Sequence, residues 1–281
     1  RVHLEEDTAR SQHDKGEGSL VDFNRAGVPL MELVTEPVIH DAETAGAFAR
    51  ELQLLLRTIE ISDANMERGE MRVEANISVS KVDGELGTKV EVKNLNSFKS
   101  VEGAIKFEIE RQIELLEKGG EIAQETRGWD ENRSKTFSQR SKETAKDYRY
   151  FPDPDITQIE TAKYLDFDSA RLSEKMPKLP SNKRLEYKNL GLPSELVEVL
   201  ISIPEADKFY SSLVSLEGCT ASLAKLSANY LTSDVLSLTA SPESTCTVDN
   251  LDPNHFLELM TMLEESKVSS RVAKEDRKSV V

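Results

Sequence analysis

Two glutamates, Glu74 and Glu91, have the residue type and the spacing that favour binding of one divalent cation. They stand in segments 71–80 and 87–94, where apolar and polar residues alternate, which predicts two β-strands with one apolar and one charged face. Pairing of these strands as a hairpin puts Asn76 opposite Glu91 and makes the two glutamates diagonal neighbours, with Cα atoms about 7–8 Å apart. Two carboxylates at that separation can share one cation through the reach of their side chains.

The predicted connection between the two strands is a tight turn at Asp83-Gly84, a dipeptide preferred in type I′ turns. With that turn, Ile77 pairs with Val90, and the apolar residues of both strands fall on one shared face. These apolar residues are Val73, Ala75, Ile77 and Val79 on the first strand and Val90 and Val92 on the second. The register is therefore consistent with one buried face and one face that presents the carboxylates.

The same charged face carries basic residues, so a second interpretation stays open. Arg72, Lys89 and Lys93 accompany the two glutamates and could neutralise them, giving an ordinary salt-bridged, solvated strand face. Two bare carboxylates at this distance would repel by roughly 2 kcal/mol at an effective dielectric of about 20, and the lysines would relieve that repulsion. Spacing alone therefore nominates a cation site without separating it from an ion-pair network.

Carboxylates are the most abundant reactive groups near the predicted strands. Glu5-Glu6-Asp7, Glu74 and Glu91 supply only oxygen ligands, which are typical of magnesium. Magnesium combined with basic or amide side chains that face a phosphate is typical of phosphoryl transfer. The candidate phosphate or substrate contacts are Arg25, Lys89, Lys93 and Asn94. The sequence has no GxxxxGKS/T, GxGxxG, HExxH or GxSxG motif, and its four histidines are scattered.

Composition bounds the class of protein. The chain has 281 residues, enough for one large domain or two ordinary ones, and a net charge of −15. Both halves are acidic, so a nucleic-acid partner could not be held by a broad positive surface alone. The two cysteines exclude a disulfide framework and make zinc ligation through cysteine unexpected. No apolar run is long enough to cross a bilayer and no leader is recognisable, so we expect an intracellular protein without membrane contact.

Hydrophobic periodicity predicts the elements that position the carboxylates. The expected strands, besides the hairpin, are 1–4, 20–25 and 30–34, and the expected helices are 41–59 and 97–118. Asp41 is a predicted N-cap, and Gly119-Gly120 is a predicted C-terminal stop. Strands beside helices of this length indicate an α+β domain.

The second part of the chain has a helical pattern from about residue 179 onward. The expected helices are 181–190, 194–202, 205–217, 221–238, 253–267 with Asp252 as its N-cap, and one from about residue 269. Residues 121–155, which have few aliphatic side chains, are expected to form a functional loop plus a strand. We therefore predict an α+β domain at 1–160 followed by an all-α helical domain at 161–281.

Several longer strings, in order along residues 1–160, closely resemble the GatB family, the amidating component of the glutamyl-tRNA(Gln)/aspartyl-tRNA(Asn) amidotransferase. They are RVHLEED at 1–7, SLVDFNRAGVPLMELVTEP at 19–37, RVEANIS at 72–78, GTKVEVKNLNSF at 87–98, QETR at 124–127 and DYRYFPDPD at 147–155. The resemblance continues more loosely to Lys274. It implies a cradle-like mixed sheet-and-helix domain followed by a helical domain. It also implies truncation at both ends, with a small tail domain following Val281 in the family.

The resemblance implies a function as well. In that family, the protein uses ATP to phosphorylate the side-chain carboxylate of mischarged Glu-tRNA(Gln) or Asp-tRNA(Asn), and ammonia that the glutaminase component releases from glutamine displaces the phosphate. The chain is thus expected to be part of a glutamine-dependent ligase that forms a carbon–nitrogen bond. Its expected partners are the A and C subunits of the amidotransferase and tRNA(Gln) or tRNA(Asn). The expected compartment is the bacterial cytoplasm or an organelle matrix.

The family's motifs fall on three acidic positions of this chain. The second glutamate of the His-x-Glu-Glu-Asp string matches Glu6, and the acidic residues of the two hairpin strings match Glu74 and Glu91. The resemblance implies that these three are catalytic magnesium ligands, with ATP as a substrate.

Zinc is not expected, because the family's zinc-binding cysteine pairs and some of its metal ligands lie upstream of Arg1. We expect this chain alone not to complete the reaction. One alternative is a non-catalytic scaffold that docks tRNA and a partner protein. Another is a stand-alone small-molecule kinase, for which no complete nucleotide pocket is recognisable in the sequence.

Overall fold

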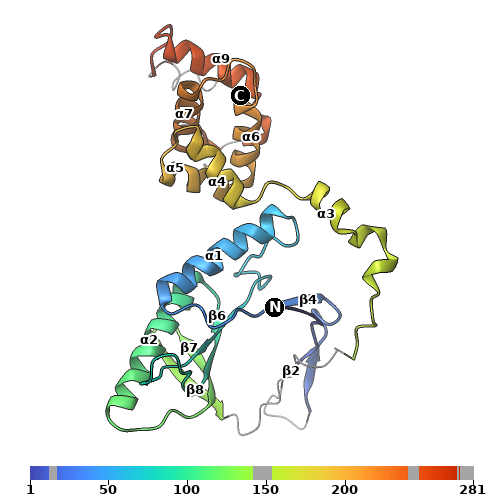
Figure 1. Ribbon diagram of the computed structural model, residues 1–281, viewed down its shortest axis with the longest axis vertical. Helices are drawn as coiled ribbons and strands as arrows, with labels where there is room; N and C mark the ends of the chain where they lie inside the picture. Colours follow the sequence, from blue (N-terminus) through green and yellow to red (C-terminus); the bar gives the residue numbers. More distant parts are fainter. Residues whose placement is uncertain (13–17, 142–153, 240–246, 271, 273–281) are drawn as a thin grey trace. The chain divides into compact units, whose positions relative to one another are not determined.

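The computed structural model describes residues 1–12, 18–141, 154–239, 247–270 and 272. They form two compact units, drawn in Figure 1. Unit 1 comprises Arg1–Gln53 and Ala64–Lys175, and unit 2 comprises Leu54–Asp63 and Met176–Val281. The predicted combination of an α+β part followed by helices is confirmed. The main boundary lies at Lys175, whereas the sequence pattern placed it at residue 160.

Unit 1 is built around a four-stranded sheet in the order β5-β6-β7-β8. The strands are β5 (Val73–Ile77), β6 (Val90–Leu95), β7 (Glu125–Asp130) and β8 (Lys135–Ser141). β5 and β6 are antiparallel, β6 and β7 are parallel, and β7 and β8 are antiparallel. A parallel pair needs a long crossover connection, and the helix α2 (Phe98–Glu117) supplies it between β6 and β7.

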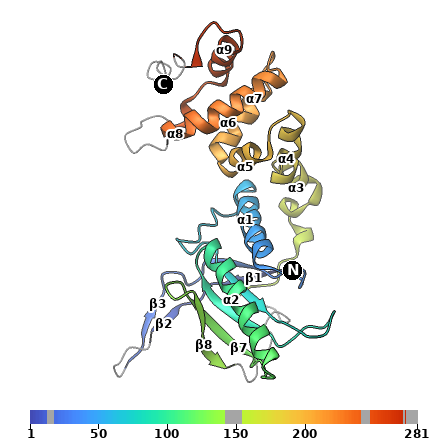
Figure 2. The same ribbon diagram turned by 90° about the vertical axis from the view of Figure 1, so that its left-hand side faces the viewer.

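The helix α2 packs along the apolar face of the sheet, as Figure 2 shows, and the first turns of α1 (Ala42–Thr58) join the same core through Ala42 and Ala45. α1 and α2 begin and end within one residue of the predicted limits. Asp41 accepts a hydrogen bond from the Thr44 amide, and Ser97 accepts one from the Ser100 amide, so both helices are capped. The buried core of unit 1 consists of Ala42, Ala45, Ala75, Ile77, Val92, Leu95, Val101, Ala104 and Ile105.

Two antiparallel ribbons complete the strands of unit 1. β1 (Val2–Glu6) pairs with β4 (Pro29–Leu33), and β2 (Arg10–Gln12) pairs with β3 (Leu20–Asp22). The sequence pattern predicted β1, β3 and β4, whereas β2 was not predicted. Side chains alternate along β1, so His3 and Glu5 are half-buried while Leu4 and Glu6 are exposed.

The structure corrects the prediction for residues 121–155. Of its described residues, 125–141 form the hairpin β7–β8, where a loop and one strand were expected. The buried positions of this hairpin include the polar residues Thr126 and Thr136, so the apolar alternation that marks a strand is weak. Trp129 packs against α2, where a side chain at Gly103 would lie 3.0 Å from its ring. Most of the DYRYFPDPD string lies outside the described residues.

The turn of the predicted hairpin is also different in detail. The Glu85 amide donates to the Val82 carbonyl, so a turn does occur at Asp83-Gly84. Among the described residues of this turn, only Gly84 has a positive φ, of 78°, whereas a type I′ turn requires positive φ at both central residues. The strands end at Ile77 and resume at Val90, so a longer connection, not a two-residue loop, joins them.

Unit 2 is helical, as predicted. Its helices are α4 (Pro180–Asn189), α5 (Ser194–Ser202), α6 (Pro204–Val214), α7 (Ala221–Tyr230), the π-helical turn η4 (Leu231–Val235), α8 (Leu236–Thr239) and α9 (Pro253–Glu264). Asp252 caps α9 through the amides of Asn254 and His255. The fully buried side chains include Tyr187, Leu200, Tyr210, Leu213, Leu231 and Met260.

Three short elements have no buried residue: η2 (Thr161–Lys163), η3 (Leu165–Phe167) and α3 (Ser169–Lys175). A fourth, η5 (Val248–Asn250), contributes Val248 to the core of unit 2. The helix predicted from about residue 269 lies largely outside the described residues. Within the described part of the chain, every helix is too short or too polar to cross a membrane.

Candidate functional site

The β5–β6 hairpin has the predicted register. Asn76 lies opposite Glu91, and Ile77 lies opposite Val90. Ala75, Ile77, Val90 and Val92 are buried in the core of unit 1. The other face of the two strands is open to solvent and carries the acidic and basic residues, because side chains alternate between the faces of a strand.

One extra residue in β6 interrupts this register beside Glu74. Ala75 pairs with Val92, but Val73 pairs with Leu95, so two residues of β6 stand opposite one residue of β5. Asn94 forms the bulge with φ of 64°, a conformation that asparagine tolerates better than most residues. The bulge keeps Lys93 on the carboxylate face while Leu95 still enters the core. Asn94 thus has a conformational reason for its residue type besides its predicted contact with substrate.

The side chains of Glu74 and Glu91 converge on one cation, and that cation is the ammonium of Lys93. Its Nζ lies 3.0 Å from Glu74 Oε1 and 3.8 Å from Glu91 Oε1. The two carboxylates therefore point to the same side of the hairpin. Lys93 was predicted to contact phosphate, and here it balances one of the two carboxylate charges, which is an ion pair of the kind that the second interpretation of the spacing expected.

Glu91 is held more firmly than Glu74. Thr126 Oγ1 donates a hydrogen bond of 3.0 Å to Glu91 Oε2, and the two residues are aligned in the parallel register of β6 and β7. Thr126 is only 2% exposed, so its hydroxyl is shielded from water where it meets Glu91. One oxygen of Glu91 is thereby oriented by β7 and the other faces Lys93. This role of Thr126 was not predicted from the sequence, although the residue lies in the QETR string.

The carboxylate oxygens of Glu74 and Glu91 are ligands of the kind that magnesium prefers, but no third acidic side chain among the described residues joins them. Among the described residues, no three histidine, cysteine, aspartate or glutamate side chains lie close enough together to hold a metal ion. Glu6 is exposed on β1, opposite Pro29, and is not gathered with Glu74 and Glu91 into such a group. The assignment of all three as magnesium ligands stays a prediction.

The opposite face of β1 carries Glu5, one of the carboxylates noted in the sequence, and lies beside Glu32, which the sequence pattern did not single out. His3 lies opposite Glu32 of β4, and His3 Nε2 is 3.8 Å from Glu5 Oε1. All three side chains are half-buried. Strand alternation could have separated Glu5 from Glu6, because neighbouring residues of a strand face opposite sides. The contribution of Glu32 depends on the pairing of β1 with β4, which the local pattern does not fix.

Arg25, a predicted phosphate contact, is tied to the end of β1. Its Nε donates to Asp7 Oδ2 at 2.7 Å, and Arg72 Nη2 donates to the same oxygen at 3.0 Å. Burial raises the pKa of Asp7, but the hydrogen bonds and charges of the two guanidiniums outweigh it and lower that pKa overall. Asp7 therefore links β1 to the segment that enters β5. Lys89, another predicted contact, is exposed immediately before β6.

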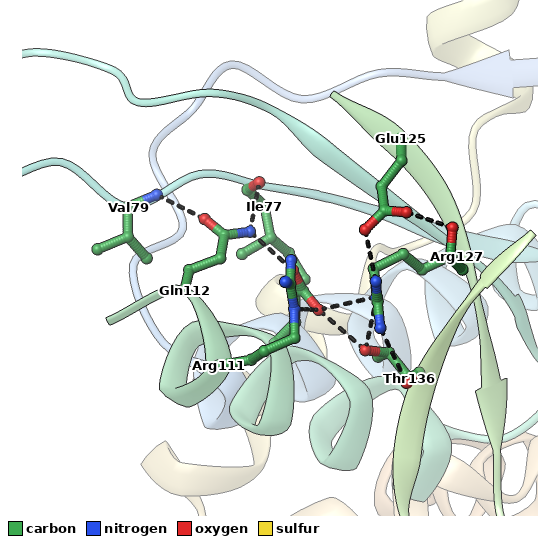
Figure 3. Close-up of polar contacts among 9 residues, drawn as sticks. Ile77, Val79, Arg111, Gln112, Glu125, Arg127 and Thr136 are labelled. Carbon is green, nitrogen blue, oxygen red and sulfur yellow. Dashed lines mark hydrogen bonds and ion pairs between the residues drawn. The ribbon is translucent and has the colours of Figure 1, made fainter. Parts of the chain in front are cut away.

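A buried polar network lies behind the sheet and is centred on Glu108 of α2. Glu108 has no solvent exposure and accepts hydrogen bonds from Arg111, Gln112 and Thr136. Figure 3 shows Gln112 reaching the end of β5, where its side chain donates to the Ile77 carbonyl at 3.3 Å and accepts from the Val79 amide at 3.0 Å. α2 thus fixes the strand that carries Glu74.

The same network reaches β7 through Arg127. Arg127 donates to the hydroxyl and carbonyl of Thr136 and pairs with Glu125, and its Nε lies 3.5 Å from Glu108 Oε2. Burial raises the pKa of Glu125, but hydrogen bonds from Ser138 and Arg127 prevail, so that pKa is lowered overall. Arg127 directly follows Thr126, so the network also holds the strand position that orients Glu91.

The sequence of residues 1–165 matches the family described as the GatB/GatE catalytic domain. This chain belongs to that family. Relatives named as the B subunit of aspartyl/glutamyl-tRNA(Asn/Gln) amidotransferase occur in Crocosphaera subtropica, Thermus thermophilus and Halorhodospira halophila, with identities of 41%, 41% and 42%. Each alignment covers 98% of this chain and 56%, 57% and 57% of the respective relative. The chain spans a little over half the length of these relatives, and the family resemblance seen in the sequence strings is confirmed.

Proposed function

We propose that this chain is the carboxylate-activating part of a tRNA-dependent amidotransferase, a ligase that forms a carbon–nitrogen bond. The observation that carries the proposal is the pair Glu74 and Glu91, whose carboxylates converge on the ammonium of Lys93. Thr126 orients the carboxylate of Glu91. Membership of the GatB/GatE family and the similarity to B subunits of aspartyl/glutamyl-tRNA(Asn/Gln) amidotransferase support the tRNA substrate. The proposed partners are the A and C subunits of the amidotransferase and tRNA(Gln) or tRNA(Asn), in the bacterial cytoplasm or an organelle matrix.

In the proposed reaction, the side-chain carboxylate of Glu-tRNA(Gln) or Asp-tRNA(Asn) attacks the γ-phosphorus of ATP. The bond between that phosphorus and the ADP oxygen breaks, and an acyl phosphate forms. Ammonia delivered by the glutaminase component then attacks the acyl carbon, phosphate leaves, and a proton is released as the amide forms. The products are ADP, phosphate and Gln-tRNA(Gln) or Asn-tRNA(Asn).

In the proposed reaction, the acidic residues of the hairpin would bind the metal ion and the basic residue Lys93 would contact phosphate. Glu74 and Glu91, with Glu6 as the third proposed ligand, would hold Mg²⁺, which when bound neutralises charge on the phosphates. Thr126 keeps one oxygen of Glu91 in a fixed direction. Lys93 balances one of the two carboxylate charges, and with a divalent cation held by the pair its ammonium would be repelled and available to a phosphate oxygen. Arg25, Lys89 and Asn94 stay candidates for substrate contact.

The test is the substitution Glu91→Gln in the assembled amidotransferase. We expect ADP formation to be lost, because an amide is a poor ligand for magnesium, while glutamine hydrolysis by the glutaminase component continues. The matched control is Glu114→Gln, which removes a carboxylate from an exposed ion pair with Lys118 on α2. ADP formation at the wild-type rate by the Glu91 variant would show that Glu91 is not a catalytic ligand.

A second candidate function is a non-catalytic scaffold for tRNA and a partner protein. The observation that favours it is the Lys93 ammonium, which lies between the two carboxylates and balances one of their charges. Among the described residues, moreover, no three acidic, histidine or cysteine side chains are grouped closely enough to hold a metal ion. Calorimetry of ATP binding with and without magnesium separates the two functions. Catalysis requires magnesium-dependent binding, whereas a scaffold predicts no effect of magnesium.

A further inference from the structure

A pocket of about 410 Å³ beside β5 has three arginines among its seven lining residues. Its lining residues are Arg25, Met66, Glu67, Arg68, Gly69, Arg72 and Asn96. Three arginines in one small pocket are notable in a chain whose net charge is −15. The volume falls within the range of pockets that bind small molecules, about 300–1,000 Å³.

Two of these arginines are positioned without being fully neutralised. Arg25 and Arg72 share a single carboxylate oxygen of Asp7, and Arg25 also donates to the Gly69 carbonyl at 3.3 Å. Their side chains stay 43% and 55% exposed. A guanidinium has five N–H donors, so each retains donors that can face a ligand. Asp7 thus positions the guanidinium groups of Arg25 and Arg72, and its single negative charge leaves this group of three with a net charge of +1.

Arg68 is presented by a structured turn. Its amide donates to Asn65 Oδ1 at 3.1 Å, and Gly69 next to it has φ of 70° and donates to the Met66 carbonyl. In the part of the chain that the structure describes, the Arg68 guanidinium takes part in no ion pair, and Glu67 is the acidic lining residue beside it. The three guanidiniums therefore exceed the two carboxylates, Asp7 and Glu67, that face them.

We infer that Arg25, Arg68 and Arg72 form a pocket that binds a phosphate group next to the carboxylate face of β5. Arginine forks match phosphate oxygens with paired hydrogen bonds, which a set of three guanidiniums around one pocket can supply. Arg72 stands two residues before Glu74, so along extended backbone both side chains leave on the same side. A phosphate in the pocket is thereby adjacent to the acidic pair.

The inferred pocket deepens the proposed function, because it rests on the same face of the hairpin. The phosphate can belong to ATP or to the sugar–phosphate backbone near the end of a bound tRNA. Binding by the arginines alone requires neither magnesium nor turnover, and so it can be measured with magnesium removed. The result then does not depend on whether Glu74 and Glu91 act as metal ligands.

The experiment measures binding of two probes to the chain in the presence of a chelator. One probe is ATP, and the other is a short RNA hairpin with a single-stranded CCA end. The variants are Arg68→Gln and Arg72→Gln, and the matched control is Arg133→Gln, which removes the same charge from the exposed β7–β8 turn. Unchanged circular dichroism and thermal midpoints confirm that each variant is folded.

We expect each pocket variant to weaken binding of at least one probe about tenfold, the loss typical of one charged hydrogen-bonded contact. Weakening with ATP alone assigns the pocket to nucleotide phosphates, weakening with RNA alone assigns it to the tRNA backbone, and either supports the inference. Binding of both probes at wild-type strength by Arg68→Gln and Arg72→Gln, an equal loss in Arg133→Gln, or no binding by the wild type would overturn it. Failure of the metal site is read separately, from ADP formation at the wild-type rate by Glu91→Gln, and does not change how these binding results are interpreted.

Discussion

Glu108 offers the sharpest test of how the fold supports the site. Its carboxylate is fully buried, yet it accepts hydrogen bonds from Arg111 Nη2 at 2.6 Å, Arg111 Nε at 2.9 Å, Gln112 Nε2 at 2.9 Å and Thr136 Oγ1 at 3.0 Å. Substitution Glu108→Ala removes every one of these acceptor sites and leaves a cavity. Because Gln112 also holds the end of β5, the damage extends to the strand of Glu74.

The loss of stability in Glu108→Ala depends on which of its former partners can find another hydrogen-bond acceptor. Removing one member of a buried ion pair typically costs about 3–5 kcal/mol. Arg111 is partly exposed and can turn to water, and Arg127 keeps its pairing with Glu125, so the lower end of that range applies. We therefore expect Glu108→Ala to destabilise unit 1 by about 3 kcal/mol. Glu108→Gln keeps the shape but loses the charge, so its loss is smaller, about 1–3 kcal/mol.

The assay uses the single tryptophan of the chain, Trp129, which lies in unit 1. Urea unfolding followed by tryptophan fluorescence thus reports on that unit, and circular dichroism follows the helices of both units. With a slope of about 2 kcal/mol per molar urea, the midpoint should fall by roughly 1.5 M for Glu108→Ala. The control Glu114→Ala removes an exposed carboxylate from the same helix and should leave the midpoint unchanged. Equal midpoints for Glu108→Ala and the wild type would refute the structural role of the network.

Three further predictions concern the hairpin and the buried carboxylates. Thr126→Val should weaken magnesium-dependent ATP binding in calorimetry, because it removes the hydroxyl that orients Glu91, and Thr126→Ser should restore it; wild-type binding by the valine variant would exclude this positioning role. The pKa values of Asp7 and Glu125 are lowered by their partners, so the stability they contribute is present above the ordinary carboxyl pKa of about 4 and is lost as pH falls below it. In acid titrations followed by Trp129 fluorescence, Glu125→Gln should make that loss shallower, and an unchanged profile would contradict the assignment. Asn94→Gly should be tolerated, whereas Asn94→Val should destabilise unit 1 by about 1–2 kcal/mol through its left-handed conformation, and equal urea midpoints for the two variants would count against that strain.

The elements that the sequence predicts well are those whose signals are local. α2 has an apolar stripe, a capping Ser97 and a stop at Gly119, and its limits follow from those residues alone. The hairpin register followed from the alternation of apolar residues around Asp83-Gly84, even though the turn itself has another form. Local periodicity and capping therefore determine where these elements begin and end.

The features that the sequence did not predict depend on contacts between distant segments. Thr126 is buried on the carboxylate face, where it is aligned with Glu91 across the β6–β7 pair, and no apolar pattern in the sequence indicates that contact. The convergence of Arg25 and Arg72 on Asp7 requires the pairing of β1 and β4 and the position of the loop before β5. Such tertiary contacts decide the candidate site, so family resemblance could nominate residues without showing which of them meet.

The bulge at Asn94 limits how this hairpin can evolve or misfold. In a regular strand, a shift of the pairing register by two residues leaves the same side chains facing the core. Here such a shift of β6 would move the bulge away from Glu74 to a position where β5 and β6 otherwise pair residue for residue. Deletion of Asn94 would remove the bulge and leave Leu95, now 1% exposed, opposite Val73 on the core side, but it would draw the start of α2 one residue closer. Insertion of one residue between Val90 and Val92 would instead place these two buried valines on opposite faces of β6, so the hairpin should tolerate loss of the bulge better than a change of register within the strand.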